Sequence, residues 1–149
     1  MRSNKIKIFI FIISVFELQA LTIEQARALE VGTNVTVRGI VTTPNFHSTG
    51  IYYGLQDGTG GLLIYYNESI TLAVGDSIEI SGSTEDYYGF FEIIPASTDD
   101  ITVISQNNSL PAFQVLTVAN FVANFEDYES ELIRINDVSI TSGTWPTES

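Results

Sequence analysis

Residues 51–66 read Ile-Tyr-Tyr-Gly-Leu-Gln-Asp-Gly-Thr-Gly-Gly-Leu-Leu-Ile-Tyr-Tyr, a pattern that predicts a β-hairpin. Two runs rich in aromatic and branched residues flank a turn at 57–61, whose glycines can supply positive φ angles. Side chains alternate faces along each arm, so Tyr53 and Leu55 share one face and Tyr52 and Gln56 share the other. Because neither face is fully polar, we expect the hairpin to lie centrally in a barrel or sandwich.

The preceding segment predicts a short helix followed by a bent strand. Thr22 and Gln25 have the spacing of a capping box, so residues 23–30 are predicted to be helical, with Gly32 after the helix end. Residues 34–43 alternate as a strand with Gly39 at the centre. A glycine inside a strand usually marks a bend, and a bent strand can pair with both sides of a small barrel.

Further strands are predicted at 77–81, 90–94, 101–104 and 132–140, with an exposed loop at 83–89 and a short helix or turn at 116–121. Five or six short strands around a bent first strand predict an all-β fold: a small antiparallel, five-stranded Greek-key barrel of the oligomer-binding (OB) type. An immunoglobulin-like sandwich is the main rival, but it needs about seven evenly spaced strands.

The first 20 residues have the pattern of a secretory signal peptide. Three basic residues precede an apolar run at 8–16, and Leu18-Gln19-Ala20 is an acceptable cleavage site. We therefore expect a secreted, periplasmic or cell-surface bacterial protein without a membrane span after cleavage. The remaining 129 residues carry three arginines and 17 acidic residues, a net charge of −14, and the sequence has no cysteine. Disulfides, thiolate metal sites and cysteine nucleophiles are thereby excluded.

These patterns divide the chain into three predicted parts. Residues 1–20 are the predicted signal peptide and residues 21–105 the barrel with its helix. Residues 106–149 are predicted to be a linker and a returning strand that leads into further domains of a longer protein, because Trp145 follows that strand directly.

Four segments also carry a family resemblance: Val35–Val41, Leu55–Leu62, Gly75–Gly82 and Tyr128–Asn136. Together they resemble the OB-fold modules of secreted bacterial nucleases of the YhcR type and related modules of exported Bacteroidetes proteins, over residues 22–141. The resemblance implies a non-catalytic accessory module that accompanies a separate nuclease or phosphatase domain.

OB folds bind oligonucleotides or oligosaccharides on strands two and three and on the adjoining loops. The resemblance thus implies single-stranded nucleic acid, on which aromatic side chains can stack. The charge disfavours tight binding of a polyanion, and a glycan- or protein-binding module is the alternative, to which Glu85 and Asp86 are better suited. A further alternative is that about half of the tyrosines are core residues. The candidate ligand-binding residues are Tyr52, Tyr53, Gln56, Tyr65, Tyr66, Tyr87, Tyr88, Phe90, Arg38 and His47.

No catalytic, metal-ligating or cofactor-binding set is predicted. His47 is the only histidine and has no acidic partner at informative spacing. Calcium ligands could come from Asp57, from Asp99 and Asp100, or from the acidic stretch at 126–131. None of these segments has the spacing of an EF-hand loop, and a solvated acidic face is the simpler interpretation.

Overall fold

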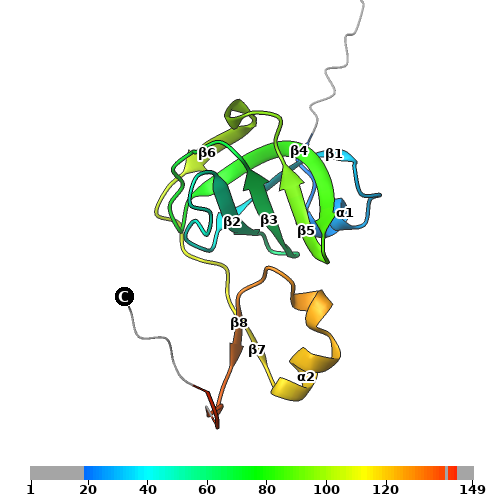
Figure 1. Ribbon diagram of the computed structural model, residues 1–149, viewed down its shortest axis with the longest axis vertical. Coiled ribbons are helices and arrows are strands. Elements are labelled where there is room, and N and C mark those ends of the chain that lie inside the picture. Colours follow the sequence, from blue (N-terminus) through cyan, green and yellow to red (C-terminus); the bar gives the residue numbers. More distant parts are fainter. Residues whose placement is uncertain (1–18, 140, 144–149) are drawn as a thin grey trace, which may run out of the picture.

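A computed structural model of the chain describes residues 19–139 and 141–143 (Figure 1). Six strands make up its main body: β1 (Asn34–Val41), β2 (Ile51–Gln56), β3 (Gly61–Tyr66), β4 (Ser77–Tyr87), β5 (Phe90–Ile94) and β6 (Ile101–Ser105). A helix, α1 (Ile23–Arg27), precedes them, and a 3₁₀ turn, η1 (Thr98–Asp100), lies between β5 and β6.

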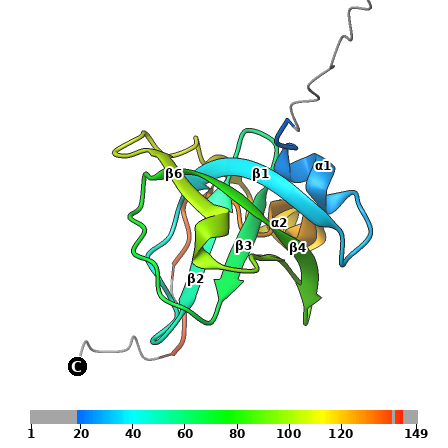
Figure 2. The same cartoon turned by 90° about the horizontal axis from the view of Figure 1, so that it is seen from above.

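The first five strands close into a ring. The order β1-β2-β3-β5-β4 returns to β1, because β1 pairs with both β2 and β4 (Figures 1 and 2). Strand β6 lies outside the ring against β4. This order is that of the OB fold, so the predicted fold is confirmed. One detail differs from the prediction: β3 and β5 run parallel, whereas the other pairs in the ring are antiparallel.

Alternation along the strands separates the barrel interior from its outer surface. In β1 the odd-numbered residues from Val35 to Val41 are buried and the intervening positions are not, as the sequence predicts. Helix α1 covers the barrel with Ile23 and Ala26, both fully buried. Its predicted capping box is present, but the helix ends at Arg27 rather than at residue 30. The remaining core residues are aliphatic side chains from all six strands and Leu72, together with Tyr53 and Phe91.

The turn between β2 and β3 depends on an aspartate rather than on glycine conformations. The predicted hairpin is present. Among the described residues, however, the glycines with positive φ are Gly32, Gly75, Gly89 and Gly143, so the positive φ angles predicted for this turn are wrong. Instead, Asp57 Oδ1 accepts hydrogen bonds from the backbone N–H groups of Thr59 and Gly60. Its Oδ2 accepts the N–H of Ile23, the first residue of α1. One carboxylate thus joins the turn to the helix.

Replacing Asp57 by alanine is therefore expected to lower the free energy of unfolding by about 1–2 kcal/mol, because three backbone donors lose their acceptor. Urea unfolding measures this, with Asp99→Ala as the control, since Asp99 is an exposed aspartate in η1. Equal stabilities of the two variants would contradict this role of Asp57.

The prediction of an exposed loop at 83–89 is wrong. Strand β4 continues to Tyr87 and pairs with β5 from Ser83 onward. Only Tyr88 and Gly89 form the turn, both with positive φ. The sequence is polar here because the last three residues of β4 are exposed, where the strand pairs only with β5, and this polar run was interpreted as a loop.

After β6 the chain forms an extension below the barrel (Figure 1). It comprises β7 (Gln114–Leu116), α2 (Val118–Ala123), η2 (Phe125–Tyr128) and β8 (Ile133–Ile135). Strands β7 and β8 pair in parallel. The helix predicted at 116–121 begins two residues later, at the start of α2. The strand at 114–116 was not predicted. Of the strand predicted at 132–140, only three residues are in β8.

Glu129 attaches this extension to the barrel. Its Oε2 lies 2.6 Å from Arg27 Nη2 of α1, and its Oε1 accepts the N–H of Phe91 at 2.7 Å. Gln56 Oε1 accepts the N–H of Leu132 at 3.0 Å. The Cα of Gly61 approaches the backbone of Ser130 so closely that a Cβ there would lie 2.3 Å from its carbonyl oxygen. The extension is therefore packed against the lower end of the barrel.

The predicted signal peptide falls almost wholly on residues 1–18, and Trp145 on 144–149, both outside the described residues. Within the described part of the chain, no helix has the length and apolar character needed to cross a membrane.

Candidate ligand-binding pocket

The outer faces of four strands meet in one surface. Tyr52 of β2 is directly opposite Tyr65 of β3, and Leu63 of β3 is the partner of Glu92 in β5. Glu92 is in turn opposite Glu85 of β4. Since side chains two residues apart share a face, these positions all lie on the same side of the sheet.

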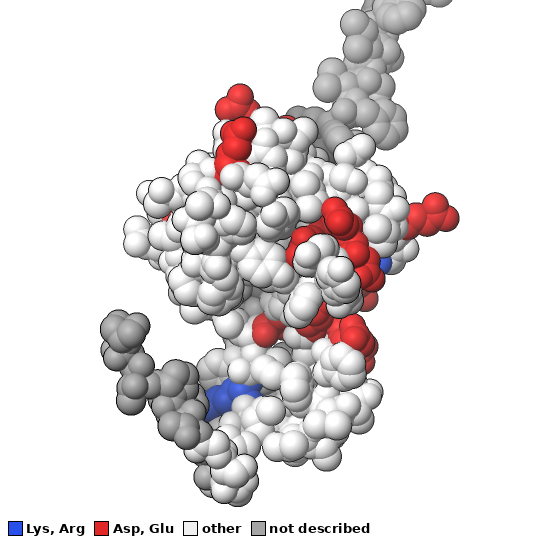
Figure 3. Space-filling model, viewed as in Figure 1, with Lys and Arg blue, Asp and Glu red and all other residues white. Residues whose placement is uncertain are grey.

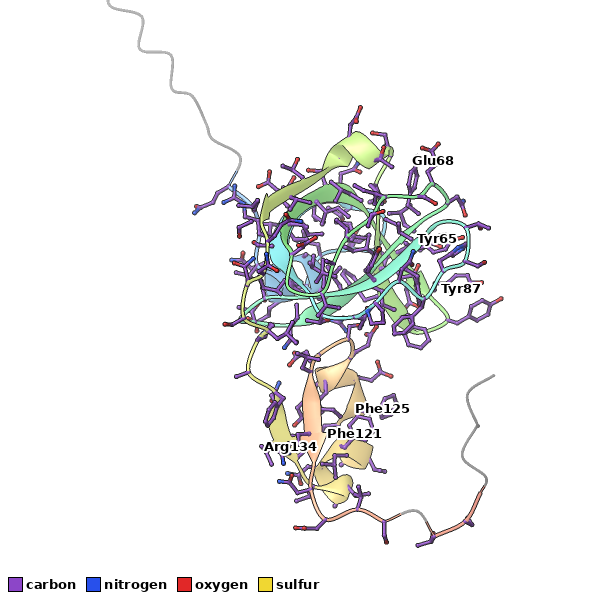
Figure 4. All side chains as sticks on the ribbon, turned by 90° about the vertical axis from the view of Figure 1, so that its left-hand side faces the viewer. Tyr65, Glu68, Tyr87, Phe121, Phe125 and Arg134 are labelled. Carbon is purple, nitrogen blue, oxygen red and sulfur yellow. The ribbon has the colours of Figure 1, made fainter. Side chains whose placement is uncertain are left out.

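A pocket of about 390 Å³ is hollowed into this surface. The loop between β1 and β2 forms one wall, and the end of β4 forms another. Tyr65 and Tyr87 lie on the same side of the barrel, as Figure 4 shows. The lining residues are Phe46, His47, Tyr52, Tyr65, Glu85, Tyr87, Glu92 and Ile94.

The loop that carries Phe46 and His47 is fixed by its own side chains. Asn45 Oδ1 accepts the N–H groups of His47 and Tyr52, at 3.0 and 2.8 Å. His47 Nδ1 accepts the N–H groups of Thr49 and Gly50, at 3.1 and 2.8 Å. With two donors aimed at Nδ1, the proton of a neutral ring belongs on Nε2. His47 therefore offers the pocket a hydrogen-bond donor held in one tautomer.

Neighbouring rings of the pocket are inclined to one another and are not stacked in parallel. The rings of Tyr52 and Tyr65 are 6.1 Å apart and close to perpendicular, and the His47 ring is 5.7 Å from that of Tyr65. Such geometry leaves ring faces uncovered by their neighbours. A flat ligand can stack against these faces.

Two carboxylates lie among the rings. The Glu92 residue is only 3% exposed, and burial raises the pKa of its carboxyl. A hydrogen bond with Tyr52 lowers that pKa, whereas the charges of Glu85 and Glu129 raise it. Burial, followed by the charge of Glu92, raises the pKa of Tyr52 to about 12. Of the described residues that line the pocket, none is lysine or arginine. Acidic side chains also gather on the surface over β4 and β5 and where the extension meets the barrel (Figure 3).

Four of the ten predicted site residues line the pocket: His47, Tyr52, Tyr65 and Tyr87. The others do not, and they fall into three groups.

The first group has structural contacts in the barrel interior or, for Gln56, on the outer face beneath the extension. Tyr53 is 3% exposed and its hydroxyl accepts the N–H of Leu72. Tyr66 packs against the core and donates its hydroxyl to the carbonyl of Ala96. Gln56 is also buried and attaches the extension. These positions are structural, in line with the alternative that part of the tyrosines belong to the core.

The second group lies near the pocket without lining it. Tyr88 is 89% exposed at the tip of the β4–β5 turn, and Phe90 is half exposed beside it. The third group is Arg38 alone, which lies outside the pocket on β1. Its Nε is 2.6 Å from Glu79 Oε2.

Four lining residues are outside the predicted set: Glu85, which was considered only for the glycan alternative, and Phe46, Glu92 and Ile94, which were not considered. Alternation offered a signal for Glu92 and Ile94, because they share a strand face with Phe90, which was predicted. The burial of Glu92 depends on contacts between distant segments, so it could not be predicted from the local sequence.

The candidate metal ligands do not come together in the part of the chain that the structure describes. Among the described residues, no group of three or more histidine, aspartate or glutamate side chains could hold a metal ion. The acidic positions 57, 99, 100 and 126–131 thus form no common centre there.

No family model and no curated protein matches this chain. Among solved structures, the chain is similar to that of the hypothetical protein YgiW from E. coli, with 22% sequence identity and a TM-score of 0.47. The match covers 58% of this chain and 90% of the YgiW chain.

Proposed function

We propose that this protein is a non-catalytic, glycan-binding module that takes an oligosaccharide in the pocket on the outer face of β2, β3, β5 and β4. One observation carries the proposal: aromatic rings and hydrogen-bonding groups converge in one pocket whose described lining contains no lysine or arginine. Sugar rings combine apolar faces with hydroxyl groups, so they need stacking surfaces and polar partners together. Tyr65 and Tyr87 supply such surfaces, and His47 and Glu85 supply polar partners.

The charge of the site disfavours the other predicted ligand, single-stranded nucleic acid. Affinity for nucleic acid depends largely on cations that neutralise phosphates. Arg27 and Arg38 are each paired with a glutamate, and Arg134 lies in the extension, where it contacts Asn136 and the Phe113 ring. A phosphate in the pocket would instead meet Glu85 and Glu92. Glycan binding as an accessory module of an exported protein is therefore the better supported function.

An array of soluble oligosaccharides probed with the full chain tests this function. Replacing Tyr65 by alanine is expected to weaken binding to the best glycan about tenfold, equivalent to about 1.4 kcal/mol, because one stacking face is lost. Phe125→Ala is the matched control, since Phe125 is an exposed aromatic residue of the extension, well away from Tyr65 (Figure 4).

Binding of (dT)20 is measured in parallel at about 20 and about 200 mM salt, because contacts to phosphates weaken steeply with salt. Failure to bind any glycan, or salt-sensitive binding of (dT)20 that Tyr65→Ala weakens, would contradict the proposed function. A glycan affinity that Tyr65→Ala and Phe125→Ala reduce equally would contradict the proposed site.

A further inference from the structure

Glu85 and Glu92 line the pocket together, and no described residue forms a salt bridge with either of them. Glu85 and Glu92 are opposite residues on adjacent antiparallel strands, an arrangement in which like charges destabilise a sheet. Glu92 is nearly completely buried and yet lines the pocket. The nearby Glu129 is already paired with Arg27. The structure thus keeps a costly negative charge at the base of an open pocket.

Burial of an unpaired carboxylate is unfavourable unless another group compensates it. The ion pair Arg27–Glu129 leaves no arginine of α1 for Glu92, and Arg38 is engaged by Glu79. Tyr52 gives one hydrogen bond but no positive charge. A cationic group of a ligand would supply the missing charge, and its contact with a carboxylate in a desolvated site is a strong, charge-assisted hydrogen bond.

The walls of the pocket suit an organic cation better than a metal ion. The faces of Tyr52, Tyr65 and Tyr87 attract cations through the ring quadrupole. A hard metal ion needs about six oxygen ligands, and aromatic rings supply none. An ammonium group has three N–H donors: Glu92 and Glu85 can accept two of them, and the open side of the pocket leaves the third to water.

We propose that the pocket selects an amino sugar, that is, an oligosaccharide that carries free protonated amines rather than N-acetylated ones. This inference rests on the proposed glycan-binding function and adds its chemical class. The sugar ring stacks on Tyr65 or Tyr87, and the ammonium group lies against Glu92 and Glu85.

Three probes test the inference by calorimetry with the full chain at about pH 6, where the amine of glucosamine, a weaker base than an alkyl amine, is largely protonated and ordinary carboxyls are ionised. The first is a trimer of glucosamine, the second is the same trimer with every amine N-acetylated, and the third is trilysine. The glucosamine trimer is expected to bind at least tenfold more tightly than each of the others, because only it has both the rings and the charge.

Glu92→Gln is expected to reduce this preference at least tenfold, since it removes the charge while keeping the shape of the side chain. Glu24→Gln is the control, because it makes the same change of net charge at an exposed position of α1. The variant Glu85→Gln tests the second carboxylate of the pocket by the same measurement of this preference.

The outcomes separate the two proposals. Equal or tighter binding of the N-acetylated trimer would overturn the selection of amines and leave the glycan-binding function standing. Trilysine as the tightest ligand would overturn the assignment of a sugar, and no binding of either trimer or of any glycan on the array would overturn the proposed function as well. A preference that Glu92→Gln and Glu85→Gln leave unchanged would overturn the role of the two carboxylates.

Discussion

Replacing Glu129 by alanine is expected to lower the free energy of unfolding by about 3 kcal/mol. Glu129 is a poorly exposed side chain, at 11%, and its two oxygens contact the Arg27 guanidinium and the N–H of Phe91. Breaking a buried ion pair by removing one partner typically costs about 3–5 kcal/mol, because the other charge stays buried without a partner. Arg27 is 26% exposed and also donates to the carbonyl of Gly61, so we expect the lower end of that range.

The same substitution is expected to release the extension from the barrel. Gln56 and the tight approach at Gly61 would remain as the other contacts described above, and neither includes a charge. Gly61→Ala provides an independent way to weaken the same contact, since its Cβ would overlap the backbone of Ser130. Limited proteolysis of the extension should therefore accelerate in both variants.

Urea unfolding and proteolysis of Glu126→Ala provide the control, because Glu126 is an exposed glutamate three residues earlier in η2. Equal stability of Glu129→Ala and Glu126→Ala would mean that the ion pair with Arg27 contributes little. Unchanged proteolysis of the extension would mean that other contacts hold it.

The barrel could be predicted from the local sequence, because each pattern that specifies a strand lies within one short segment. The alternation from Val35 to Val41 and the two arms of the hairpin at 51–66 each specify a strand and its buried face. The capping box of Thr22 and Gln25 likewise specifies the start of α1. What these patterns lack is the pairing between distant strands, and the parallel contact between β3 and β5 was accordingly not predicted.

The candidate site was predicted only in part for a related reason. Tyrosines 52 and 53 are adjacent and chemically identical, and the choice of which one faces the core depends on strand register. The structure places Tyr53 inside and Tyr52 in the pocket. Gln56 was predicted to contact a ligand, but its partner is Leu132, 76 residues away. Contacts at such separations follow from the docking of the extension, about which the sequence pattern says nothing.

Glu92→Gln is expected to stabilise the protein in the absence of ligand, by about 2 kcal/mol at neutral pH. A buried charged group that lacks full compensation costs on the order of 1–3 kcal/mol, and glutamine keeps the shape and hydrogen-bonding ability of the side chain without the charge. A substitution that keeps the shape of a buried side chain and yet stabilises the protein would be unusual for a structural residue, because most substitutions at buried positions destabilise. It is the behaviour expected of a residue kept for binding.

The pH dependence of this effect has a definite sign. Burial raises the pKa of Glu92 in the folded protein, so the folded state holds the proton at a pH where the unfolded state has lost it. Stability therefore falls as pH rises from the ordinary carboxyl pKa, about 4.3, through the raised pKa of the folded state. The charged groups around Glu92 act in the same direction, because the carboxylates of Glu85 and Glu129 also raise that pKa. The hydrogen bond with Tyr52 opposes them but does not reverse the shift.

Urea unfolding of the parent protein and Glu92→Gln at several pH values between about 3.5 and 8 isolates this contribution. The other acidic residues titrate in both proteins, so the difference between the two stabilities reports on Glu92 and its neighbours. We expect that difference to be small at the acidic end, where Glu92 is protonated in both states, and to grow in favour of the variant as pH rises. A difference in stability that stays constant with pH, or that favours the parent protein at neutral pH, would mean that Glu92 already has a favourable partner in the fold. The argument for a cationic ligand would then lose its electrostatic basis.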